Sequence, residues 1–219
     1  MSDFQQTKSM INHGTTTVGI VYTDGVVLAA DTRAIAGSYY IAHKAVKKIQ
    51  KISDHLGVTI AGGVADAQTV VDTLRYYANI FKLEKNKPIP VKSTAQLTSN
   101  IFFSARFYPY MADIMVGGVD DNGGAIYNID LFGSLTKDKF HSTGSGSPVA
   151  FGILESKFKD NLTIDEAISI AAKAVNAAIL RNAGTGDGFD IVVITKGKYR
   201  ELSKDEKDAA LKKIRGIPS

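Results

Sequence analysis

Residues 15–34 read TTTVGIVYTDGVVLAADTRA, and this stretch decides the fold. Apolar and polar residues alternate at its start, which is the period of a β-strand, and the Asp-Gly pair at 24–25 is typical of a tight turn. Val18, Ile20 and Tyr22 fall on one face of the first strand. The stretch therefore predicts two strands joined by a turn. Three threonines open it, and because Thr is β-branched and common in strands, they need no chemical role on this ground alone.

The rest of the chain switches between strand-like and helix-like periodicity. Two capping boxes predict the starts of two helices: Thr163 with Glu166, and Ser203 with Glu206. Further strands are predicted at 39–42, 47–52, 57–63, 112–120, 124–133 and 189–195. Helices are predicted at 67–81, 93–108 and 147–158, and after each of the two capping boxes.

The order of these elements indicates the fold class. Strands come first, then two helices, strands, two helices, a strand and a helix. Neighbouring strands joined by tight turns form antiparallel sheets, and helices that come in pairs cover them as layers. We therefore expect an α+β fold in which two antiparallel sheets form a sandwich between helix layers, built as a single domain.

Composition excludes several classes of protein. The chain has 219 residues, of which 44% are hydrophobic and 22% charged, as in an ordinary globular protein. The net charge of +4 is small and the basic residues are dispersed among acids, so nucleic-acid binding is not supported. The absence of cysteine excludes disulfides and thiol nucleophiles. Residues 1–14 lack the apolar core of a signal peptide, and no run spans a membrane. We expect a soluble, cytoplasmic protein without membrane contacts.

The catalytic motifs that are easiest to recognise are missing. The sequence has no G-x-S-x-G elbow, no phosphate-binding G-x-x-x-x-G-K-[ST] loop and no H-E-x-x-H. Its four histidines are scattered without metal-ligand spacing, so neither a metal nor a cofactor is expected. The Gly-rich GTGDG at 184–188 follows a helix and precedes a strand, the wrong order for a phosphate loop, and is interpreted as a turn. A mechanism based on Ser, Thr or Lys remains.

Four short motifs taken together resemble a known family. They are GTTTVGIVYTDGVVLAADTRA at 14–34, KKI at 47–49, TIAGGVADAQ at 59–68 and STGSGSP at 142–148. In this order and at nearly these spacings they resemble the β-subunits of archaeal 20S proteasomes, which are N-terminal-nucleophile peptidases. The resemblance runs from Gly14 to about Thr195. It implies a four-layer αββα sandwich, in agreement with the fold expected from periodicity.

The resemblance gives the first threonine a role. In this family a prosegment is removed by self-cleavage between Gly and Thr, which here implies the bond between Gly14 and Thr15. Residues 1–14 would be the prosegment and residues 15–219 the catalytic domain. The freed α-amine has a reference pKa of about 7.7–8.0, close to the operating pH, so it can be the base that activates the Thr15 hydroxyl.

Four further residues are implied around Thr15. Asp31, within AADTRA, matches the family's acid, and Lys48 matches its catalytic lysine. Without the resemblance they would be interpreted as a turn acid and a solvated lysine. Gly62 supplies a backbone amide that stabilises the oxyanion, and Ser145 forms hydrogen bonds near the terminal amine.

Two departures from the family pattern affect this site. The segment before the lysine pair is one residue longer than usual, which makes Lys47 a rival to Lys48. Strand alternation lets only one of them reach Thr15, and the apolar residue after the pair favours Lys48. The family's Asp at the end of the long helix is Asn182 here, and its partner Ser is Thr185. Both can form hydrogen bonds, but Asn carries no charge, so the tuning of the terminal amine stays open.

Six residues match the substrate pocket of the family: Ala34, Val46, Gln50, Ile60, Val64 and Gln68. Four are apolar and none is charged. We expect cleavage after large hydrophobic residues, since burying a Leu or Phe side chain stabilises by roughly 1.5–3 kcal/mol and a charged side chain would lose its hydration. The alternative is that the two glutamines converge on the pocket floor and accept a polar or charged group.

The resemblance also implies partners. It implies a barrel in which rings of α-subunits cap two seven-membered rings of β-subunits, with unfolded polypeptides as substrates and an ATP-dependent unfoldase acting through the α ring. Tyr76, Tyr77 and five aromatic residues within 100–111 exceed what one core face needs, so part of this surface is expected in subunit contacts.

Two other functions are compatible with the sequence. One is a catalytically weak, structural β-type subunit of the same barrel, and the other is a stand-alone N-terminal-nucleophile amidase. Gly14-Thr15 together with Lys48 favours an active threonine endopeptidase over the structural subunit. The complete set of motifs favours it over the amidase.

Overall fold

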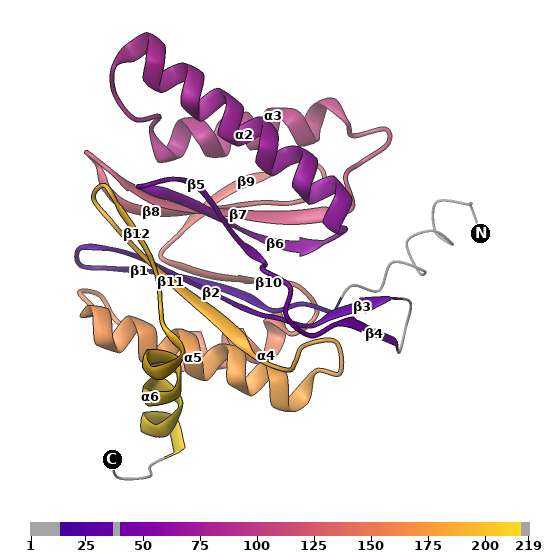
Figure 1. Cartoon of the computed structure of the whole chain (residues 1–219), viewed down its shortest axis with the longest axis vertical. Helices are drawn as coiled ribbons and strands as arrows, with labels where there is room; N and C mark the ends of the chain where they lie inside the picture. Colours follow the sequence, from indigo (N-terminus) through magenta and orange to yellow (C-terminus); the bar gives the residue numbers. More distant parts are fainter. Residues whose placement is uncertain (1–13, 37–39, 216–219) are drawn as a thin grey trace.

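A computed structural model describes residues 14–36 and 40–215 of the chain, without the side chains of residue 64 and residues 212–215. Four layers are stacked in Figure 1: a helix pair at the top, two β-sheets, and a second helix pair below. The helices are α2 (Val64–Lys85), α3 (Val91–Ser104), α4 (Ser147–Lys157), α5 (Ile164–Arg181) and α6 (Lys204–Arg215). The fold is therefore the αββα sandwich of two antiparallel sheets that the sequence predicts.

The first sheet has the strand order β10-β1-β2-β11-β12 and packs on α4 and α5. Its strands are β1 (Thr17–Tyr22), β2 (Gly25–Asp31), β10 (Phe140–Thr143), β11 (Phe189–Thr195) and β12 (Lys198–Glu201). The hairpin of β1 and β2 confirms the two strands joined by a tight turn, but the turn residues are Thr23 and Asp24 rather than 24–25, since Gly25 pairs with Tyr22 as the first residue of β2. Because β10 pairs with β1 and β11 pairs with β2, both strands of this hairpin are inner strands of the sheet.

The second sheet has the order β5-β6-β7-β8-β9 and packs on α2 and α3. Its strands are β5 (Ile49–Ser53), β6 (Leu56–Gly62), β7 (Ala112–Asp120), β8 (Gly123–Ile129) and β9 (Leu135–Asp138). A separate two-stranded ribbon, β3 (Ala34–Ala36) with β4 (Tyr40–His43), extends from one end of the sandwich (Figure 1). All pairings in both sheets are antiparallel.

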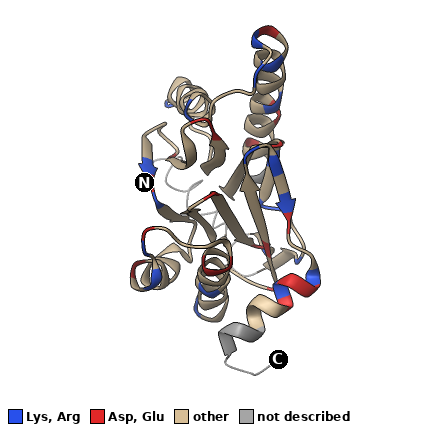
Figure 2. Cartoon of the chain, turned by 90° about the vertical axis from the view of Figure 1, so that its left-hand side faces the viewer, with Lys and Arg blue, Asp and Glu red and all other residues tan. Residues whose placement is uncertain are grey.

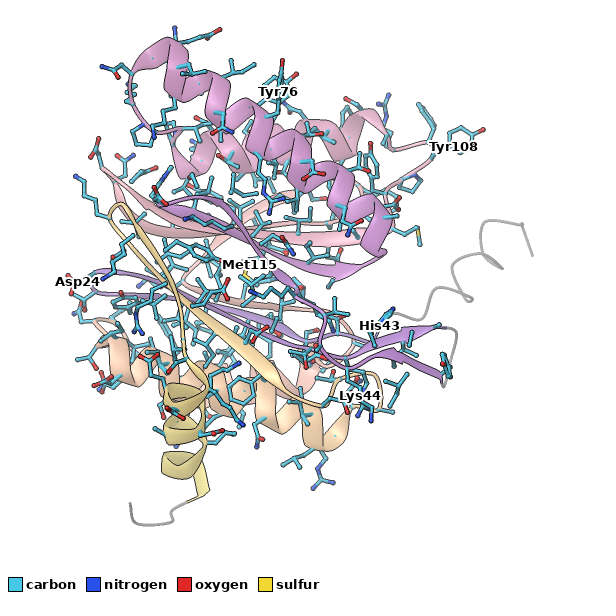
Figure 3. The ribbon with its side chains drawn as sticks, viewed as in Figure 1. Asp24, His43, Lys44, Tyr76, Tyr108 and Met115 are labelled. Atoms are coloured by element: carbon cyan, nitrogen blue, oxygen red, sulfur yellow. The ribbon has the colours of Figure 1, made fainter. Side chains whose placement is uncertain are left out.

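Buried apolar side chains fill the three spaces between the four layers. Val18, Ile20 and Tyr22 pack with α5 on the outer face of the first sheet, as their shared face predicts. The residues on the other face, among them Leu28, meet the second sheet, where Met115 lies between the two sheets in Figure 3. A strand buried on both faces needs apolar residues at nearly every position, which is what residues 25–31 provide.

The prediction of a helix at 93–108 was wrong at both ends. Helix α3 begins at Val91, directly after Pro90, and ends at Ser104. The amide of Ala105 bonds to the carbonyls of Ile101 and Phe102, and Tyr108 bonds back to Ala105, so residues 105–108 form turns rather than another helical turn. The aromatic residues of this segment consequently lie on an exposed connection.

Charged residues of both signs are mixed along the helices and at the ends of strands (Figure 2). The long central strands are almost free of them, in keeping with their burial. None of the described helices is long and apolar enough to cross a membrane.

Candidate active site

Thr15, Asp31 and Lys48 come together at one end of the first sheet. Thr15 lies two residues before β1, Asp31 is the last residue of β2, and Lys48 directly precedes β5. Because β1 and β2 are antiparallel, the start of one lies beside the end of the other. In Figure 3 this is the end of the sandwich marked by His43 and Lys44, opposite the Asp24 turn.

The hydroxyl of Thr15 contacts a buried ion pair. Lys48 Nζ lies 3.0 Å from Thr15 Oγ1 and 2.8 Å from Asp31 Oδ1. The Lys48 side chain is 7% exposed and that of Asp31 is fully buried. Burial lowers the pKa of the Lys48 ammonium below its ordinary value, and the Asp31 carboxylate opposes this shift. The arrangement places a confined positive charge at the oxygen of Thr15.

Asp31 is held by backbone amides as well as by Lys48. Its Oδ1 accepts from Thr16 N at 2.8 Å, and its Oδ2 accepts from Arg33 N and Gly186 N, both at 3.1 Å. A buried carboxylate is costly unless hydrogen bonds and a counter-charge compensate its lost hydration. These amides come from three separate segments, so the carboxylate also fixes those segments around Thr15.

Lys47 lies elsewhere. Its Nζ forms an exposed ion pair with Glu201 Oε2 at 2.9 Å, and its side chain is 65% exposed. The extra residue before the lysine pair therefore leaves Lys48, not Lys47, in contact with Thr15.

Each of the three consecutive threonines has different partners. Thr15 contacts Lys48, whereas the Thr16 hydroxyl lies 2.8 Å from Thr185 Oγ1. Thr17 Oγ1 lies 2.6 Å from Thr143 Oγ1 and accepts from Thr59 Oγ1 at 3.1 Å. All three are buried, so these hydrogen bonds compensate for the lost hydration of their hydroxyls. The triplet is thus one hydroxyl in contact with the Lys48–Asp31 pair, followed by two hydroxyls that hydrogen-bond to neighbouring segments.

Ser145 and Thr185 contact residues 15 and 16, and Asn182 connects the two. Ser145 Oγ accepts from Thr15 N at 3.5 Å, a long contact, and donates to Asn182 Oδ1 at 3.0 Å. Thr185 Oγ1 also donates to Asn182 Oδ1, at 3.0 Å. These hydrogen bonds connect the loop after β10 with the loop after α5.

Two glycines permit close approach of backbones at the site. A Cβ at Gly14 would lie 2.0 Å from the carbonyl oxygen of Gly184, so any side chain at 14 would collide with that loop. Gly62 has φ of +114°, and a Cβ there would lie 2.3 Å from Met111 O. Thr15 and Gly62 line the same cavity.

This cavity has a volume of about 450 Å³. Five of the six predicted pocket residues line it: Ala34, Val46, Gln50, Ile60 and Gln68. The side chain of the sixth, Val64, lies outside the described part. Sequence reasoning missed five other lining residues: Arg33, Ile35, Ala42, His43 and Lys47. Two of these are charged, but Arg33 is paired with Asp187 and Lys47 with Glu201.

Comparison with known proteins gives the family. The model of the proteasome subunit family matches residues 11–194. The chain belongs to the proteasome subunit family. It is 55% identical to "Proteasome subunit beta 2" of Nitrosopumilus maritimus, over 92% of this chain and 95% of that protein. It is 47% identical to "Proteasome subunit beta 2" of Hyperthermus butylicus, over 89% of this chain and 91% of that protein. It is 44% identical to "Proteasome subunit beta" of Methanopyrus kandleri, over 92% of this chain and 97% of that protein.

The chain is accordingly a proteasome β-subunit of the archaeal type, in agreement with the resemblance noted in its motifs. Proteasome subunits assemble with other subunits into a barrel, and the family is in general one of proteases. Among the described residues of this β-subunit, no three His, Asp or Glu side chains form a group that could hold a metal ion.

An ion pair between Arg33 and Asp187 lies beside the site of this proteasome subunit and was not predicted. Arg33 donates to Asp187 Oδ2 at 3.0 Å and to the carbonyl of Ala183 at 2.9 Å, holding the loop 182–187 against the end of β2. The motif AADTRA contains this arginine, but its partners lie about 150 positions further along the chain. The sequence offers no local signal for that pairing.

Proposed function

We propose that this β-subunit is a threonine endopeptidase of an archaeal-type proteasome, with Thr15 as nucleophile. The observation that carries the proposal is the contact of Thr15 Oγ1 with the buried Lys48–Asp31 pair, at the wall of a cavity that can receive a side chain. A Thr hydroxyl is weakly nucleophilic unless a base takes its proton and a positive charge stabilises the resulting oxygen.

The same geometry supports self-cleavage of the bond between Gly14 and Thr15. Thr15 Oγ1 lies 2.7 Å from the carbonyl oxygen of Gly14, and Lys48 Nζ lies 3.3 Å from that oxygen. Attack of Oγ1 on the Gly14 carbonyl carbon would convert the amide to an ester and leave the nitrogen as an amine. Lys48 would stabilise the negative charge that develops on the carbonyl oxygen. Water would then hydrolyse the ester and release residues 1–14, of which 1–13 lie outside the described residues.

After cleavage the Thr15 amine becomes the base. Its reference pKa of about 7.7–8.0 lets it take the hydroxyl proton near neutral pH. Oγ1 would attack a substrate carbonyl whose side chain occupies the cavity, and the Gly62 amide would donate to the oxyanion, an interaction worth about 10²–10³ in rate. Unfolded polypeptides fit this reaction because a folded domain cannot thread its backbone into such a cavity.

The proposed setting follows that of the relatives. We infer a cytoplasmic barrel of α- and β-subunits that receives unfolded chains from an ATP-dependent unfoldase. The number in the name "Proteasome subunit beta 2" of two relatives supports the existence of a second β-type subunit beside this one.

A second candidate function is a weakly active, structural β-type subunit. Asn182 favours it, because an amide supplies no charge to the site where the family pattern has an acid. The two candidates differ in turnover, not in fold or assembly.

Mass spectrometry and peptide turnover of particles assembled with α-subunits test the proposal. We expect the mature chain to begin at Thr15 and to cleave peptides, while a Thr15→Ala particle keeps its N-terminal segment and is inactive. A particle that retains residues 1–14 and still cleaves peptides would contradict the mechanism. Correct processing with turnover below a hundredth of that of an active sister subunit would favour the structural candidate.

A further inference from the structure

A second cavity lies at the end of the sandwich opposite Thr15. Its volume is about 510 Å³, close to the 450 Å³ of the cavity at Thr15. It is lined by the turns that follow β5, β7 and β11, by the C-terminal end of α2 and by the connection from α2 to α3. These segments gather at the left of Figure 1, on the side of the Asp24 label in Figure 3, and this end faces the viewer in Figure 2. The proposed reaction does not use this cavity.

Hydrogen bonds between different segments hold the walls of this second cavity in place. His55 Nε2 lies 2.8 Å from the carbonyl oxygen of Ile89, which can only accept, so this nitrogen carries the hydrogen. The Asp120 carboxylate accepts from Val91 N at 2.9 Å and from Asn122 N at 2.8 Å. These bonds join the strand turns to the α2–α3 connection and to the start of α3. The protein's own hydrogen bonds therefore fix the shape of the cavity, as in most binding sites for small molecules.

The inner wall of the second cavity is apolar. Ile52, Ala78, Ile89 and Val119 line it, although each of them is at most 7% exposed. They belong to two hydrophobic clusters, so the cavity opens directly onto the core. Moving an apolar side chain from water onto such a wall is favourable in proportion to the area that it buries. This wall therefore fits an apolar group.

The three carboxylates of the lining are already engaged. Asp54 is paired with Lys51 at 2.7 Å, and Asp121 with Lys196 at 2.9 Å. Asp120 accepts the two backbone hydrogens described above. The hydrogen bonds from Lys51 and Lys196 lower the pKa of Asp54 and that of Asp121, so both carboxylates are ionised and matched near neutral pH.

Two further lysines of the lining lack a close acidic partner. Lys82 lies in the last turn of α2 and Lys87 in the connection to α3, and both are exposed. Neither forms an ion pair with another residue in the part of the chain that the structure describes. They act on Asp54 and Asp121 only as smaller, longer-range charges. The α2 side of the cavity thus carries positive charge that an anionic group can match.

We propose that this second cavity binds the C-terminal residue of a peptide. The apolar side chain of that residue packs on Ile52, Ile89 and Val119. Its carboxylate pairs with Lys82 and Lys87. The choice of a peptide rests on the proposed function, because cleavage after large hydrophobic residues releases peptides that end in an apolar side chain beside a free carboxylate. The charge and polarity of the lining themselves do not depend on that reaction.

NMR titration of the full chain carrying Thr15→Ala, which removes the nucleophile, tests this binding. We expect N-acetylphenylalanine to bind with a Kd of about 1 mM and to shift the amide signals of Asn122 and Gly197 at the cavity. Its C-terminal amide lacks the charge and should bind about fivefold more weakly. N-acetylglycine lacks the apolar side chain and should bind at least about tenfold more weakly. The Gly62 amide reports separately on the cavity at position 15.

Two double variants with the same change of net charge locate the carboxylate. Lys82→Ala with Lys87→Ala should weaken the binding of N-acetylphenylalanine about fivefold and abolish its advantage over the amide. Lys157→Ala with Lys204→Ala removes two exposed lysines of α4 and α6, outside the cavity, and should leave binding unchanged. All four side chains are exposed, so neither variant should lose its fold.

Equal binding of the acid and its amide, equal affinities in the two double variants, or shifts at Gly62 alone would overturn the inference. Tighter binding of octanoate than of N-acetylphenylalanine would refute the peptide in favour of a fatty acid. Equilibrium dialysis of N-acetylphenylalanine against particles assembled with α-subunits should show the same loss in the Lys82–Lys87 variant. Equal binding there would mean that subunit contacts cover the cavity, and would refute the site. Because none of these measurements needs turnover, a failure of the proposed endopeptidase activity would be seen separately.

Discussion

Lys48 and Asp31 form a buried pair in which neither charge can be removed without consequence. Breaking such a pair by removing one partner typically costs about 3–5 kcal/mol, because the other charge stays buried. Asp31 would keep three backbone amide donors if Lys48 were removed. The lysine is therefore needed more for the charge at Thr15 Oγ1 than for holding Asp31 in place.

We predict that Lys48→Ala abolishes both self-cleavage and turnover, whereas Lys47→Ala keeps a measurable rate. Lys48 contacts Thr15 Oγ1, while Lys47 is engaged with Glu201 on the surface. Processing by mass spectrometry and turnover of a peptide measure the two effects. Lys48→Arg keeps the buried charge and controls for folding, and light scattering shows whether each variant assembles. A dead Lys47→Ala particle beside an active Lys48→Ala particle would contradict the prediction.

The sequence predicted the placement of some residues better than others. The resemblance gave Lys48 its role, and two local signals, strand alternation and the apolar residue after the pair, then favoured it over Lys47. The contacts of Asn182 and Thr185 with Ser145 and Thr16 could be reached only through a resemblance, because they join residues 37 and 169 positions apart. Neither a local pattern nor the resemblance indicated the Arg33–Asp187 ion pair.

At the scale of elements, we expect the stabilisation by the capping box of α5 to depend on pH. Thr163 Oγ1 accepts from Glu166 N, and the Glu166 carboxylate accepts from Thr163 N and pairs with Lys159. The Lys159 ammonium, followed by the hydrogen bonds that the Thr163 backbone and hydroxyl donate to the carboxylate, lowers the pKa of Glu166 from 4.5 to about 2. A lowered carboxylate pKa stabilises the fold above the unfolded value, so this stabilisation is lost as the pH falls from about 4.5 to about 2.

We predict that Thr163→Ala lowers the free energy of unfolding by about 1 kcal/mol at pH 7. The amide of Glu166 loses its acceptor, and the N-terminus of α5 is left uncapped. Urea unfolding of the isolated chain measures this, with the exposed strand residue Thr136→Ala as control. The difference in the free energy of unfolding between Glu166→Gln and wild type should vanish toward pH 2. A difference that instead grows on acidification would contradict the pKa argument.

The pocket at Thr15 predicts substrate choice. Its wall includes apolar side chains from three elements or their flanks, Ile35, Val46 and Ile60, and two of its charged groups are already paired with acids outside the cavity. We predict faster turnover of fluorogenic peptides that end in Tyr than of matched peptides that end in Arg or Glu. None of the described lining residues is an acid that could pair with an Arg, and a Glu would have to compete with Asp187 and Glu201 for Arg33 and Lys47. A higher kcat/KM for Arg or Glu would support the alternative in which Gln50 and Gln68 accept a polar group.

Long or strongly patterned elements were predictable and short edge strands were not. The β1–β2 hairpin and the two capping boxes are encoded by residues within a few positions of one another. Strands β9, β10 and β12 have four residues each and lie at or beside sheet edges, where one partner strand decides their conformation. The end of α3 was missed because the aromatic residues that follow it continue an apolar pattern without continuing the helix.

At the scale of the whole molecule, aromatic side chains lie on the outside of the α2–α3 layer. Tyr108 is 92% exposed, Phe107 78% and Tyr76 60%, and Figure 3 shows Tyr76 and Tyr108 directed away from the sheets. Exposed aromatics of this kind are enriched in subunit interfaces. This surface agrees with assembly into a barrel and with the excess of aromatic residues noted in the sequence.

We predict that the double substitution Phe107→Ser with Tyr108→Ser reduces the fraction of chain found in large particles when α-subunits are present. Both side chains are exposed in the single chain, so the free energy of unfolding of the isolated chain should change by less than about 0.5 kcal/mol. Light scattering and urea unfolding give the two values. Normal assembly of this variant would place the subunit contact elsewhere on the surface.

The closeness of Thr15 Oγ1 to the carbonyl of Gly14 has a kinetic consequence. If the chain cuts its own bond, removal of the prosegment is a first-order reaction of each assembled copy. Its half-life should then be independent of protein concentration once particles have formed, and added mature particles should not accelerate it. Tenfold dilution of freshly assembled precursor distinguishes the two routes. The rate of self-cleavage should stay the same, whereas the rate of cleavage by a neighbouring particle should fall in proportion to the concentration.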